Sequence, residues 1–243
     1  MQLKVLGSGS SGNGYVLEAE QEALVIEAGC KLLEAKRAVG FNLSKVVGCI
    51  VTHQHNDHAG YAKEYADAGV VVLALPSVIE AKQLERNAKA ITLGRGYLIG
   101  GFKVLPFEVK HDVPCVGYLI EHRECGRVLF VTDTYAYQYD YKGINHWMIE
   151  ANYADDILEE NIIEGRVPQV MRNRLLLSHM EIGNTVGVLE RSDLSRTRNV
   201  VLIHLSNGNS NAKRFVEQVQ AATGKPTCWA KAGDVIPFNA TPL

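Results

Sequence analysis

The sequence of 243 residues lacks several features that define large protein classes. It has no apolar run near the ~20 residues that a membrane-spanning helix needs. Residues 1–5 lead directly into a strand pattern, so no signal peptide is evident. The net charge is −2, which excludes the overall basic surface of a non-specific nucleic-acid binder. We therefore expect a cytoplasmic protein that has no membrane partner.

Cysteine pairs and linker signals are also missing. The five cysteines are odd in number and scattered, and none forms a Cys-x-x-Cys pair, so we expect reduced thiols. No low-complexity tract, linker or repeat of 20–50 residues divides the chain. Because 47% of the residues are hydrophobic, the chain can bury a large core. We expect one domain over residues 1–243.

The most informative segment is a cluster of histidines and aspartate. His53, His55, Asp57 and His58 fall within six residues, in the pattern His-x-His-x-Asp-His. The cluster follows the apolar stretch 46–51, which is typical of a buried strand. A loop that leaves the end of a strand can turn several side chains toward one point. Imidazole and carboxylate groups suit Zn²⁺, Mn²⁺ or Fe²⁺, so the segment predicts a metal site.

The cluster resembles the signature of the metallo-β-lactamase superfamily. In that family the pattern continues with an isolated histidine, an aspartate after a strand, and a histidine after a late strand. This chain has all three in that order: His111, Asp133 and His204, after the apolar stretches 102–109, 128–132 and 199–203. The resemblance therefore extends over nearly the whole chain.

This resemblance implies a fold and a metal centre. The fold would be a four-layer αββα sandwich of the α/β class, with the site along the edge where the loops of the two sheets meet. The cofactors would be two divalent metal ions, Zn²⁺, Mn²⁺ or Fe²⁺, and a hydroxide that bridges them would be the nucleophile. Asp57 would also polarise the attacking water. The implied ligands are His53, His55 and His111 for one ion, Asp57, His58 and His204 for the other, and Asp133 as the bridge.

The periodicity predicts two β-rich halves that each carry helices. We expect strands at 3–6, 15–19, 23–27, 46–51 and 70–74, further strands up to residue 131, and strands at 146–150 and 200–204. We expect helices at 31–39, 59–68, 77–87, 155–164, 169–177, 184–191 and 211–223, the last closed by Gly224.

The turn at residues 6–13, rich in glycine and hydroxyl groups, bears on the substrate. It resembles the start of nuclease-like members of the superfamily, including the YycJ/WalJ-type exonucleases and, more loosely, ribonuclease Z. Ser8, Ser10 and Asn13, with exposed backbone N–H groups, are candidates to hold a phosphate. A plain β-turn is the alternative. The turn lacks the Gly-Lys-Ser/Thr end of a nucleotide-binding Walker A loop.

Three later residues complete the candidate site. Glu150, in Glu-Ala-Asn-Tyr, resembles the exonuclease branch and is expected to orient a metal-binding histidine; a helix N-terminal acid is the alternative. His179 resembles the extra histidine of phosphodiesterases in this superfamily, which protonates the leaving oxygen or contacts the scissile phosphate. The alternative for His179 is a surface histidine. Ser206, in Ile-His-Leu-Ser, resembles the His-Leu-Ser of the exonuclease branch.

Two clusters of side chains could contact a nucleic acid. Arg166, Arg172 and Arg174 precede His179 and could form a local phosphate-binding patch, although such a run is more often a solvated helix face. Alternating tyrosines after Asp133 could form a stacking surface for a base, with internal packing or a dimer contact as alternatives. These are Tyr135, Tyr137, Tyr139 and Tyr141.

The sequence departs from the family pattern at two positions. Glu27 stands where the superfamily usually has an aspartate, and the longer side chain could shift a hydrogen bond behind the metal ligands. Tyr135 stands where exonuclease-like members usually have glycine, and it could reshape the pocket entrance. The chain also lacks the long inserted arm with which ribonuclease Z grips tRNA.

Together, these features predict a dinuclear metal-dependent hydrolase of phosphodiester bonds, with nucleic acid or a nucleotide as the substrate. The alternatives are a cyclic-nucleotide phosphodiesterase, or a thioesterase- or lactonase-type metallo-hydrolase that uses the same ions. A non-enzymatic binding protein on this fold is less favoured because all the metal ligands are present. The sequence is also compatible with a homodimer.

Overall fold

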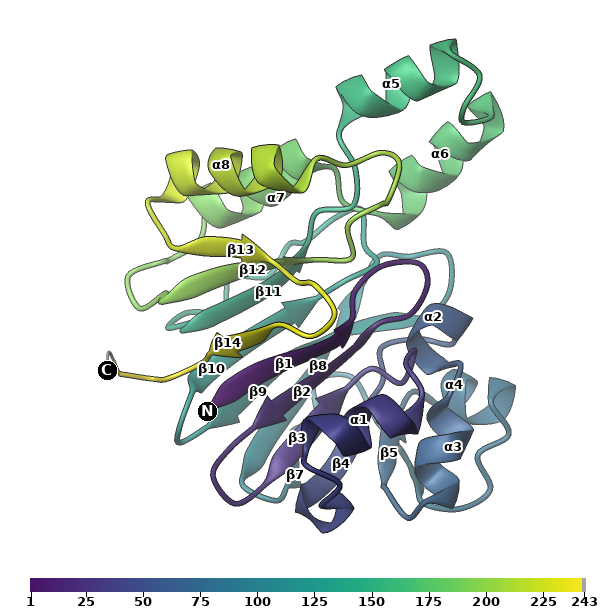
Figure 1. The fold of residues 1–243 in the computed structure, drawn as a ribbon, viewed down its shortest axis with the longest axis vertical. Helices are drawn as coiled ribbons and strands as arrows, with labels where there is room; N and C mark the ends of the chain where they lie inside the picture. The colour runs from purple at the N-terminus through teal and green to yellow at the C-terminus, as the bar shows by residue number, and fades with distance from the viewer. Residues whose placement is uncertain (242–243) are drawn as a thin grey trace.

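The strands of residues 1–241, the part of the chain that the computed structural model describes, form two seven-stranded sheets that pack face to face (Figure 1). The first sheet has the order β14 (Val235–Pro237), β1 (Gln2–Gly7), β2 (Gly14–Glu18), β3 (Ala23–Ile26), β4 (Val46–Ile50), β5 (Val72–Ala74) and β6 (Ala88–Ala90). The second has the order β13 (Thr227–Trp229), β12 (Asn199–Ile203), β11 (His146–Glu150), β10 (Gly126–Val131), β9 (Cys115–His122), β8 (Phe102–Val109) and β7 (Tyr97–Ile99).

Each central strand is apolar on both faces, because each sheet is covered on both sides. In β3, Leu24 and Ile26 face the other sheet, whereas Ala23 and Val25 face helices. In β12, Val201 and Ile203 face the first sheet, whereas Val200 and Leu202 face helices. Three apolar layers therefore separate four layers of secondary structure, and the predicted αββα sandwich is confirmed.

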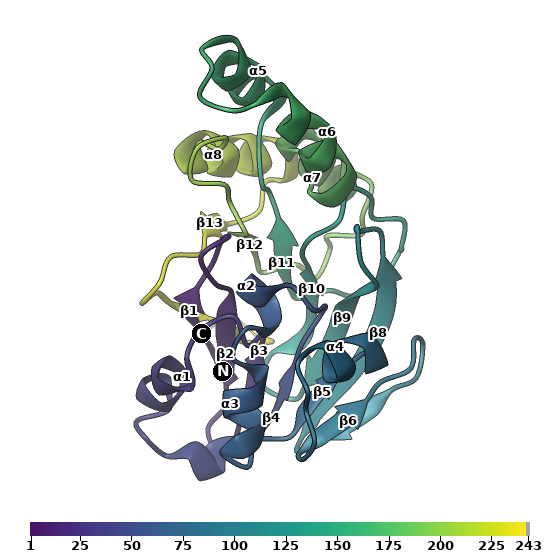
Figure 2. The same cartoon turned by 90° about the vertical axis from the view of Figure 1, so that its right-hand side faces the viewer.

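Helices cover the outer faces of both sheets (Figure 2). Over the first sheet lie α1 (Leu32–Ala38), α2 (Asn56–Ala59), α3 (Ala62–Asp67) and α4 (Pro76–Ala81), after which the chain passes to the second sheet. Over the second sheet lie α7 (Ile182–Glu190) and α8 (Ala212–Thr223). The remaining helices, α5 (Asp155–Ile163) and α6 (Gln169–Ser178), form a hairpin that projects beyond the sandwich (Figure 1).

Parallel strand pairs direct the site residues to one edge of the sandwich. Strands β3 to β6 pair in parallel in the first sheet, and β10 to β13 pair in parallel in the second. The carboxyl ends of parallel neighbours meet at the same edge, so the loops that follow them lie side by side. Strand β14 returns from the second half of the chain and pairs with β1, which joins the two halves.

Two predicted helices have different bounds in the structure. The helix expected at 59–68 is divided into α2 and α3, because the Tyr61 N–H donates to the Ala28 carbonyl, 2.8 Å away, instead of continuing the first helix. The helix expected at 77–87 ends at Ala81; the backbone is left-handed at Gln83 and Asn87 (φ 51° and 50°), and β6 follows. The edge strands β6, β7, β13 and β14, of three residues each, were not predicted as separate strands.

The other predicted helices are confirmed within two residues at each end, including the closure of α8 by Gly224 (φ 65°). The five cysteines are free thiols. Among the described residues, no helix combines the length and the hydropathy that crossing a bilayer requires.

Candidate metal centre and its surroundings

The residues predicted as metal ligands gather at one edge of the sandwich, just beyond strand ends. All seven are brought together: His53, His55, Asp57 and His58 after β4, His111 after β8, Asp133 after β10, and His204 after β12. Side chains within these groups present nitrogen and oxygen atoms that lie within 4.8 Å of one another. This is the spacing that a shared cation requires, and it arises from four separate segments of the chain.

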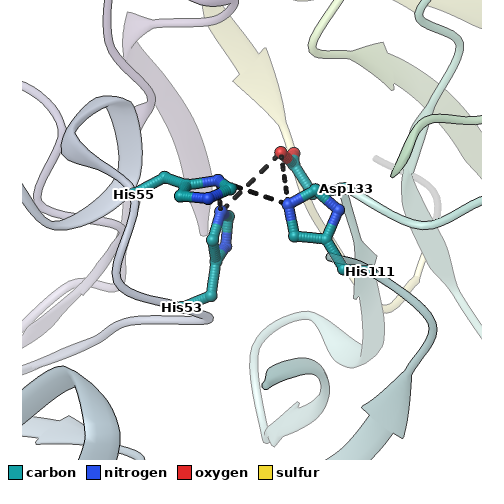
Figure 3. Close-up of side chains that lie close together, drawn as sticks. All are labelled: His53, His55, His111 and Asp133. Atoms are coloured by element: carbon teal, nitrogen blue, oxygen red, sulfur yellow. Dashed lines mark hydrogen bonds and ion pairs between the residues drawn. The ribbon is translucent and has the colours of Figure 1, made fainter. Parts of the chain in front are cut away.

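The first group combines three imidazoles with one carboxylate oxygen (Figure 3). His55 Nδ1 lies 3.0 Å from His53 Nε2 and 3.3 Å from His111 Nε2. Asp133 Oδ2 lies 3.8 Å from His53 Nε2 and 3.7 Å from His111 Nε2. Four donor atoms therefore converge on one point, from the loops after β4, β8 and β10.

The second group is built around the other oxygen of the same aspartate. Asp133 Oδ1 lies 3.3 Å from His58 Nε2 and 3.7 Å from His204 Nε2. Asp57 Oδ2 lies 3.3 Å from each of these two nitrogens. Asp133 thus presents one oxygen to each group.

The backbone is strained at this edge of the sandwich. Glu27, Asp133 and His204 have φ angles of 65°, 50° and 54°, in the left-handed region that residues other than glycine rarely adopt. Each residue follows a strand end in the site, where the strained backbone turns its side chain toward the metal groups. Such strain concentrates at functional sites and persists only where the surroundings hold it.

Hydrogen bonds on the far side of the rings fix which nitrogen of two imidazoles is free. His111 Nδ1 lies 3.0 Å from the Ser178 carbonyl oxygen, which can only accept, so Nδ1 carries the proton. Thr52 Oγ1 donates to Glu27 Oε1 at 2.6 Å and accepts from His53 Nδ1 at 2.9 Å. Both rings are thereby left with an unprotonated Nε2 toward the cluster, the arrangement of metal-binding histidines.

Glu150 orients two histidines, as the sequence predicted for one. This fully buried carboxylate accepts from His179 Nδ1 at 2.7 Å, and its same oxygen lies 3.2 Å from His204 Nδ1. The second oxygen accepts from the backbone N–H groups of Thr134 and Met180 at 3.1 and 3.3 Å. These four contacts hold the carboxylate in one position, and it in turn fixes the orientation of the two rings.

Glu27, which stands where the family usually has aspartate, still reaches the ring behind the second group. Its Oε1 lies 3.3 Å from His58 Nδ1. That contact is an ion pair rather than a hydrogen bond, because the buried Nδ1 has no hydrogen-bond partner of suitable geometry among the described residues. The extra methylene lets Glu27 contact Thr52 and His58 together.

The charges of the cluster suit a cation. Burial alone would raise the pKa of Asp133, but the facing His204 and His58 rings hold that pKa well below its usual range. Burial opposes protonation of His204, yet the Asp133, Asp57 and Glu150 carboxylates outweigh it and raise the pKa of His204 to about 10. The acids thus keep their negative charge at neutral pH, and a bound cation would take the place of the imidazole protons.

His179 lies beside the second group with one nitrogen still available. Its ring stacks on that of His204, with 5.3 Å between centroids and 15° between planes. Burial lowers the pKa of His179, but the Glu150 carboxylate raises it by more, so its pKa lies above the ordinary value. Nδ1 is occupied by Glu150, which leaves Nε2 for a substrate atom.

In the turn after β1, two of the three predicted polar side chains contact candidate metal ligands as well as the surrounding fold. Ser8 Oγ accepts from the His204 backbone N–H at 2.9 Å and from the Tyr15 hydroxyl at 2.8 Å. Asn13 is buried and bonds with Gly9, and its Nδ2 lies 3.1 Å from His58 Nε2. Ser10 is exposed and lines two pockets beside the cluster, one of which the exposed Ser11 also lines.

The arginine run does not form one patch. Arg166 pairs with Glu164, and Arg172 Nε lies 2.5 Å from Glu159 Oε1. Arg174 lines a pocket next to the cluster that His179 and Ser206 also line. One of the three arginines is therefore placed to contact a substrate.

The tyrosines after Asp133 serve mainly in packing. They lie in an irregular segment, and Tyr139 and Tyr141 stack on each other with 5.6 Å between centroids and both contact the Phe107 ring. Tyr137 is buried. Tyr135 is 39% exposed, and it is not among the residues that line the pockets at Asp57, His111 and His179.

Three contacting residues received no role from the sequence. Asp112 Oδ1 lies 3.0 Å from His111 Nε2 and 3.5 Å from His55 Nε2, at the solvent rim of the first group. Thr52 connects Glu27 to a ligand ring, and Asn152 Nδ2 donates to the His204 carbonyl at 2.8 Å. Thr52 and Asp112 adjoin ligands in the sequence, which is the one signal that pointed to them.

Comparison with known proteins gives consistent matches. The family model of the Metallo-beta-lactamase superfamily matches residues 7–145, more than half of the chain. Exodeoxyribonuclease YycJ of Bacillus anthracis is 26% identical over 92% of this chain and 90% of its own length. Exodeoxyribonuclease WalJ of Streptococcus pneumoniae is 26% identical over 98% of this chain and 96% of its own. The crystal structure of YhfI from Bacillus subtilis, a metallo-beta-lactamase fold protein, aligns with a TM-score of 0.74 at 16% identity, over 97% and 99% of the two chains.

Proposed function

This chain belongs to the metallo-β-lactamase superfamily, and from that membership and the geometry above we propose that it is a dinuclear metal-dependent phosphodiesterase that cleaves nucleic acid. The two relatives named as exodeoxyribonucleases cover nearly its full length, which supports a nucleic-acid substrate. The observation that carries the proposal is the position of Asp133, whose two oxygens face different groups of donors.

In this proposal the two groups hold one divalent ion each. The donor atoms fit, because the distal hydrogen bonds of His53 and His111 leave Nε2 of each ring free toward the cluster. Glu150 Oε1 lies 3.2 Å from Nδ1 of His204, so the Nε2 of this ring also faces the cluster. Two such ions supply Lewis-acid activation of water and stabilise negative charge on a phosphoryl group. The proposed ligands are His53, His55 and His111 for the first ion, Asp57, His58 and His204 for the second, and Asp133 for both.

The residues around the ions would position the substrate and supply a proton. In hydrolysis, a water oxygen bonds to phosphorus, the bond from phosphorus to the leaving oxygen breaks, and that oxygen takes up a proton. His179 Nε2 is the proposed donor of this proton, with Glu150 holding the opposite nitrogen. Asp57 would orient the attacking water in addition to binding metal. Ser10, which is exposed, and Ser206, which is half-buried, line the pocket beside His179 and would contact the substrate.

A substrate panel tests the proposal. Metal-free protein reloaded with Zn²⁺, Mn²⁺ or Fe²⁺ would be assayed on single- and double-stranded DNA, RNA, cyclic mononucleotides, bis-p-nitrophenyl phosphate, a thioester, a lactone and a β-lactam. We expect cleavage of nucleic acid and of bis-p-nitrophenyl phosphate, and loss of both in Asp57→Ala. Turnover of the thioester, the lactone or the β-lactam without phosphodiester cleavage would overturn the proposal.

A further inference from the structure

A pocket of about 380 Å³ is lined by residues of the candidate metal centre and of α6, the second helix of the projecting hairpin. His179 and His204 border it on the side of the metal centre. Ser10, from the turn after β1, and Ser206, after β12, border it as well. The volume is at the lower end of the about 300–1,000 Å³ of small-molecule sites. The pocket therefore suits one small unit of a larger substrate.

The walls of this pocket differ in chemistry. Val167, Pro168, Met171 and Leu175 form an apolar wall from α6 and the turn before it. Arg174, from the same helix, adds a cation. An apolar wall next to a cation matches a nucleotide, which has an apolar base face and an anionic phosphate.

Arg174 is the unneutralised cation of the hairpin. Arg166 and Arg172, which both precede it in the sequence, pair with Glu164 at the end of α5 and with Glu159 in α5. Within residues 1–241, no carboxylate lies at ion-pair distance from Arg174, which is exposed. A guanidinium that no acid of the protein neutralises can accept a phosphate in its bidentate fork.

Two other pockets that border the metal centre are less suited to a phosphate. The pocket at Asp57, of about 440 Å³, is lined by that acid and by no basic side chain. The pocket at His111, of about 410 Å³, contains Lys110, but Lys110 Nζ lies 3.5 Å from Glu108 Oε1, and Asp112 adds a second acid. The charge distribution thus favours the α6 side for a polyanion.

We propose that the α6 pocket binds one unpaired nucleotide on the leaving-group side of the scissile bond, with its base on the apolar wall and its next phosphate on Arg174. The inference rests on the proposed function and specifies its substrate as a single-stranded segment. The leaving side is assigned because His179, the proposed donor to the leaving oxygen, lines this pocket. A base pair inside a duplex shows the protein only its groove edges, so an interior paired base cannot place its face against this wall.

The test compares Arg174→Ala and Arg174→Lys with the matched control Arg172→Ala, which removes a paired arginine of the same helix. The substrates are a single-stranded DNA oligonucleotide and bis-p-nitrophenyl phosphate, which has no further phosphate. Arg174→Ala should raise KM for the oligonucleotide ~10–100-fold more than KM for bis-p-nitrophenyl phosphate, the range of one charged hydrogen bond. Arg174→Lys should recover part of the loss, and Arg172→Ala should keep the wild-type ratio.

Salt and base dependence give independent readouts. The slope of log KM for the oligonucleotide against log salt should fall by ~0.7 in Arg174→Ala, since one phosphate contact to a single strand is lost. An oligonucleotide with an abasic residue on the leaving side should have a higher KM than the intact oligonucleotide in the wild type. The increase in KM should be smaller in Met171→Ala, because that variant already lacks part of the apolar wall for the base.

Equal losses on both substrates, or the same effect in Arg172→Ala, would overturn the inference while leaving the nuclease proposal intact. A wild-type protein that hydrolyses bis-p-nitrophenyl phosphate but no oligonucleotide would instead overturn the proposed nuclease function. That result is obtained before any variant is made, so the two failures are distinguishable.

Discussion

His179 is held in place by a single buried carboxylate that also contacts a proposed metal ligand. Glu150 Oε1 lies 2.7 Å from His179 Nδ1 and 3.2 Å from His204 Nδ1. One carboxylate therefore couples the orientation of the proposed acid to that of the second metal group. The geometry explains how a histidine outside the proposed ligand set can still be aligned with the candidate metal site.

The role of His179 as an acid predicts a dependence on the leaving group. His179→Ala should slow cleavage of DNA or RNA by ~10²–10⁴-fold, the usual contribution of general acid catalysis. It should slow bis-p-nitrophenyl phosphate hydrolysis far less, because p-nitrophenolate leaves without a proton. Steady-state rates on both substrates measure the difference, and metal content should be unchanged. Equal losses on both substrates would indicate a positioning role instead.

The proposed ligand assignment predicts the metal content of each variant. Protein purified without chelator and reloaded should contain about two ions per chain, as expected of a two-metal site. His204→Ala should retain about one ion, because the first group does not include His204. His122→Ala is the control, since His122 lies outside the cluster and contacts Glu22. Elemental analysis gives the counts, and one ion or none in the reloaded wild type would contradict the dinuclear model.

At the scale of elements, the metal loop is packed directly against the turn that follows β3. A Cβ atom added to Gly29 would lie 1.8 Å from the Asp57 carbonyl oxygen and 2.7 Å from the Asn13 backbone nitrogen. The Asn13 N–H donates to that same carbonyl at 2.7 Å. Three segments thus meet where no side chain fits, which positions α2 and its ligands.

Gly29→Ala should therefore displace the loop that carries Asp57 and His58. We expect the free energy of unfolding to fall by about 3 kcal/mol or more, which is at or above the upper end of the usual cost of overpacking. The cost is high because the added Cβ would clash with backbone atoms, which cannot move aside as a flexible side chain can. Urea denaturation of the metal-free proteins measures the loss, and metal affinity should fall as well. Gly96→Ala is the control, because nothing lies within 4 Å of its added Cβ. Similar effects of the two changes would contradict the packing argument.

At the scale of the whole molecule, a histidine joins the two sheets at the end opposite the metal centre. His146 begins β11, whose last residue is Glu150 at the site. Its ring stacks on Phe238, just after β14 of the first sheet, with 4.2 Å between centroids and 9° between planes. His146 Nδ1 bonds to Asn199 Oδ1 at 2.6 Å, and its buried Nε2 has no partner among the described residues.

This environment predicts a pH dependence of stability. Burial lowers the pKa of His146 from 6.5 to about 4. Between those values the unfolded chain binds a proton at this position and the folded chain does not, so stability is lost as the pH falls. The contribution is about 3 kcal/mol across the window, from ~1.4 kcal/mol per pKa unit.

Denaturant unfolding of the wild type and His146→Gln between pH 7.5 and pH 4 measures this effect at one fixed metal loading. The difference in unfolding free energy between the two proteins should shrink as the pH falls, because the variant lacks this titrating group. Other buried histidines titrate in both proteins and cancel in the difference. A difference that stays constant with pH would contradict the assignment.

The sequence by itself determined the family, the layer architecture and the seven candidate ligands. It could do so because the motifs resemble those of a known family, and the resemblance implied the fold and the ligand set. Hydropathy added that each candidate ligand follows an apolar strand stretch. Four of the candidate ligands fall within six residues of sequence, so they could be grouped without the tertiary structure: His53, His55, Asp57 and His58. Short local motifs also pointed to Glu150 and His179, whose proposed roles stay predictions.

Only the tertiary structure decided which atoms meet. Asp133 divides its oxygens between two groups because strands β4, β8, β10 and β12 end at one edge, a consequence of sheet order that no local pattern encodes. The structure also showed that Arg172 forms an ion pair, whereas Arg174 has none among the described residues. It showed as well that Ser8 and Asn13 form hydrogen bonds within the protein. The partner of Ser8, the His204 backbone, lies 196 residues along the chain, so long-range packing rather than sequence spacing sets that contact.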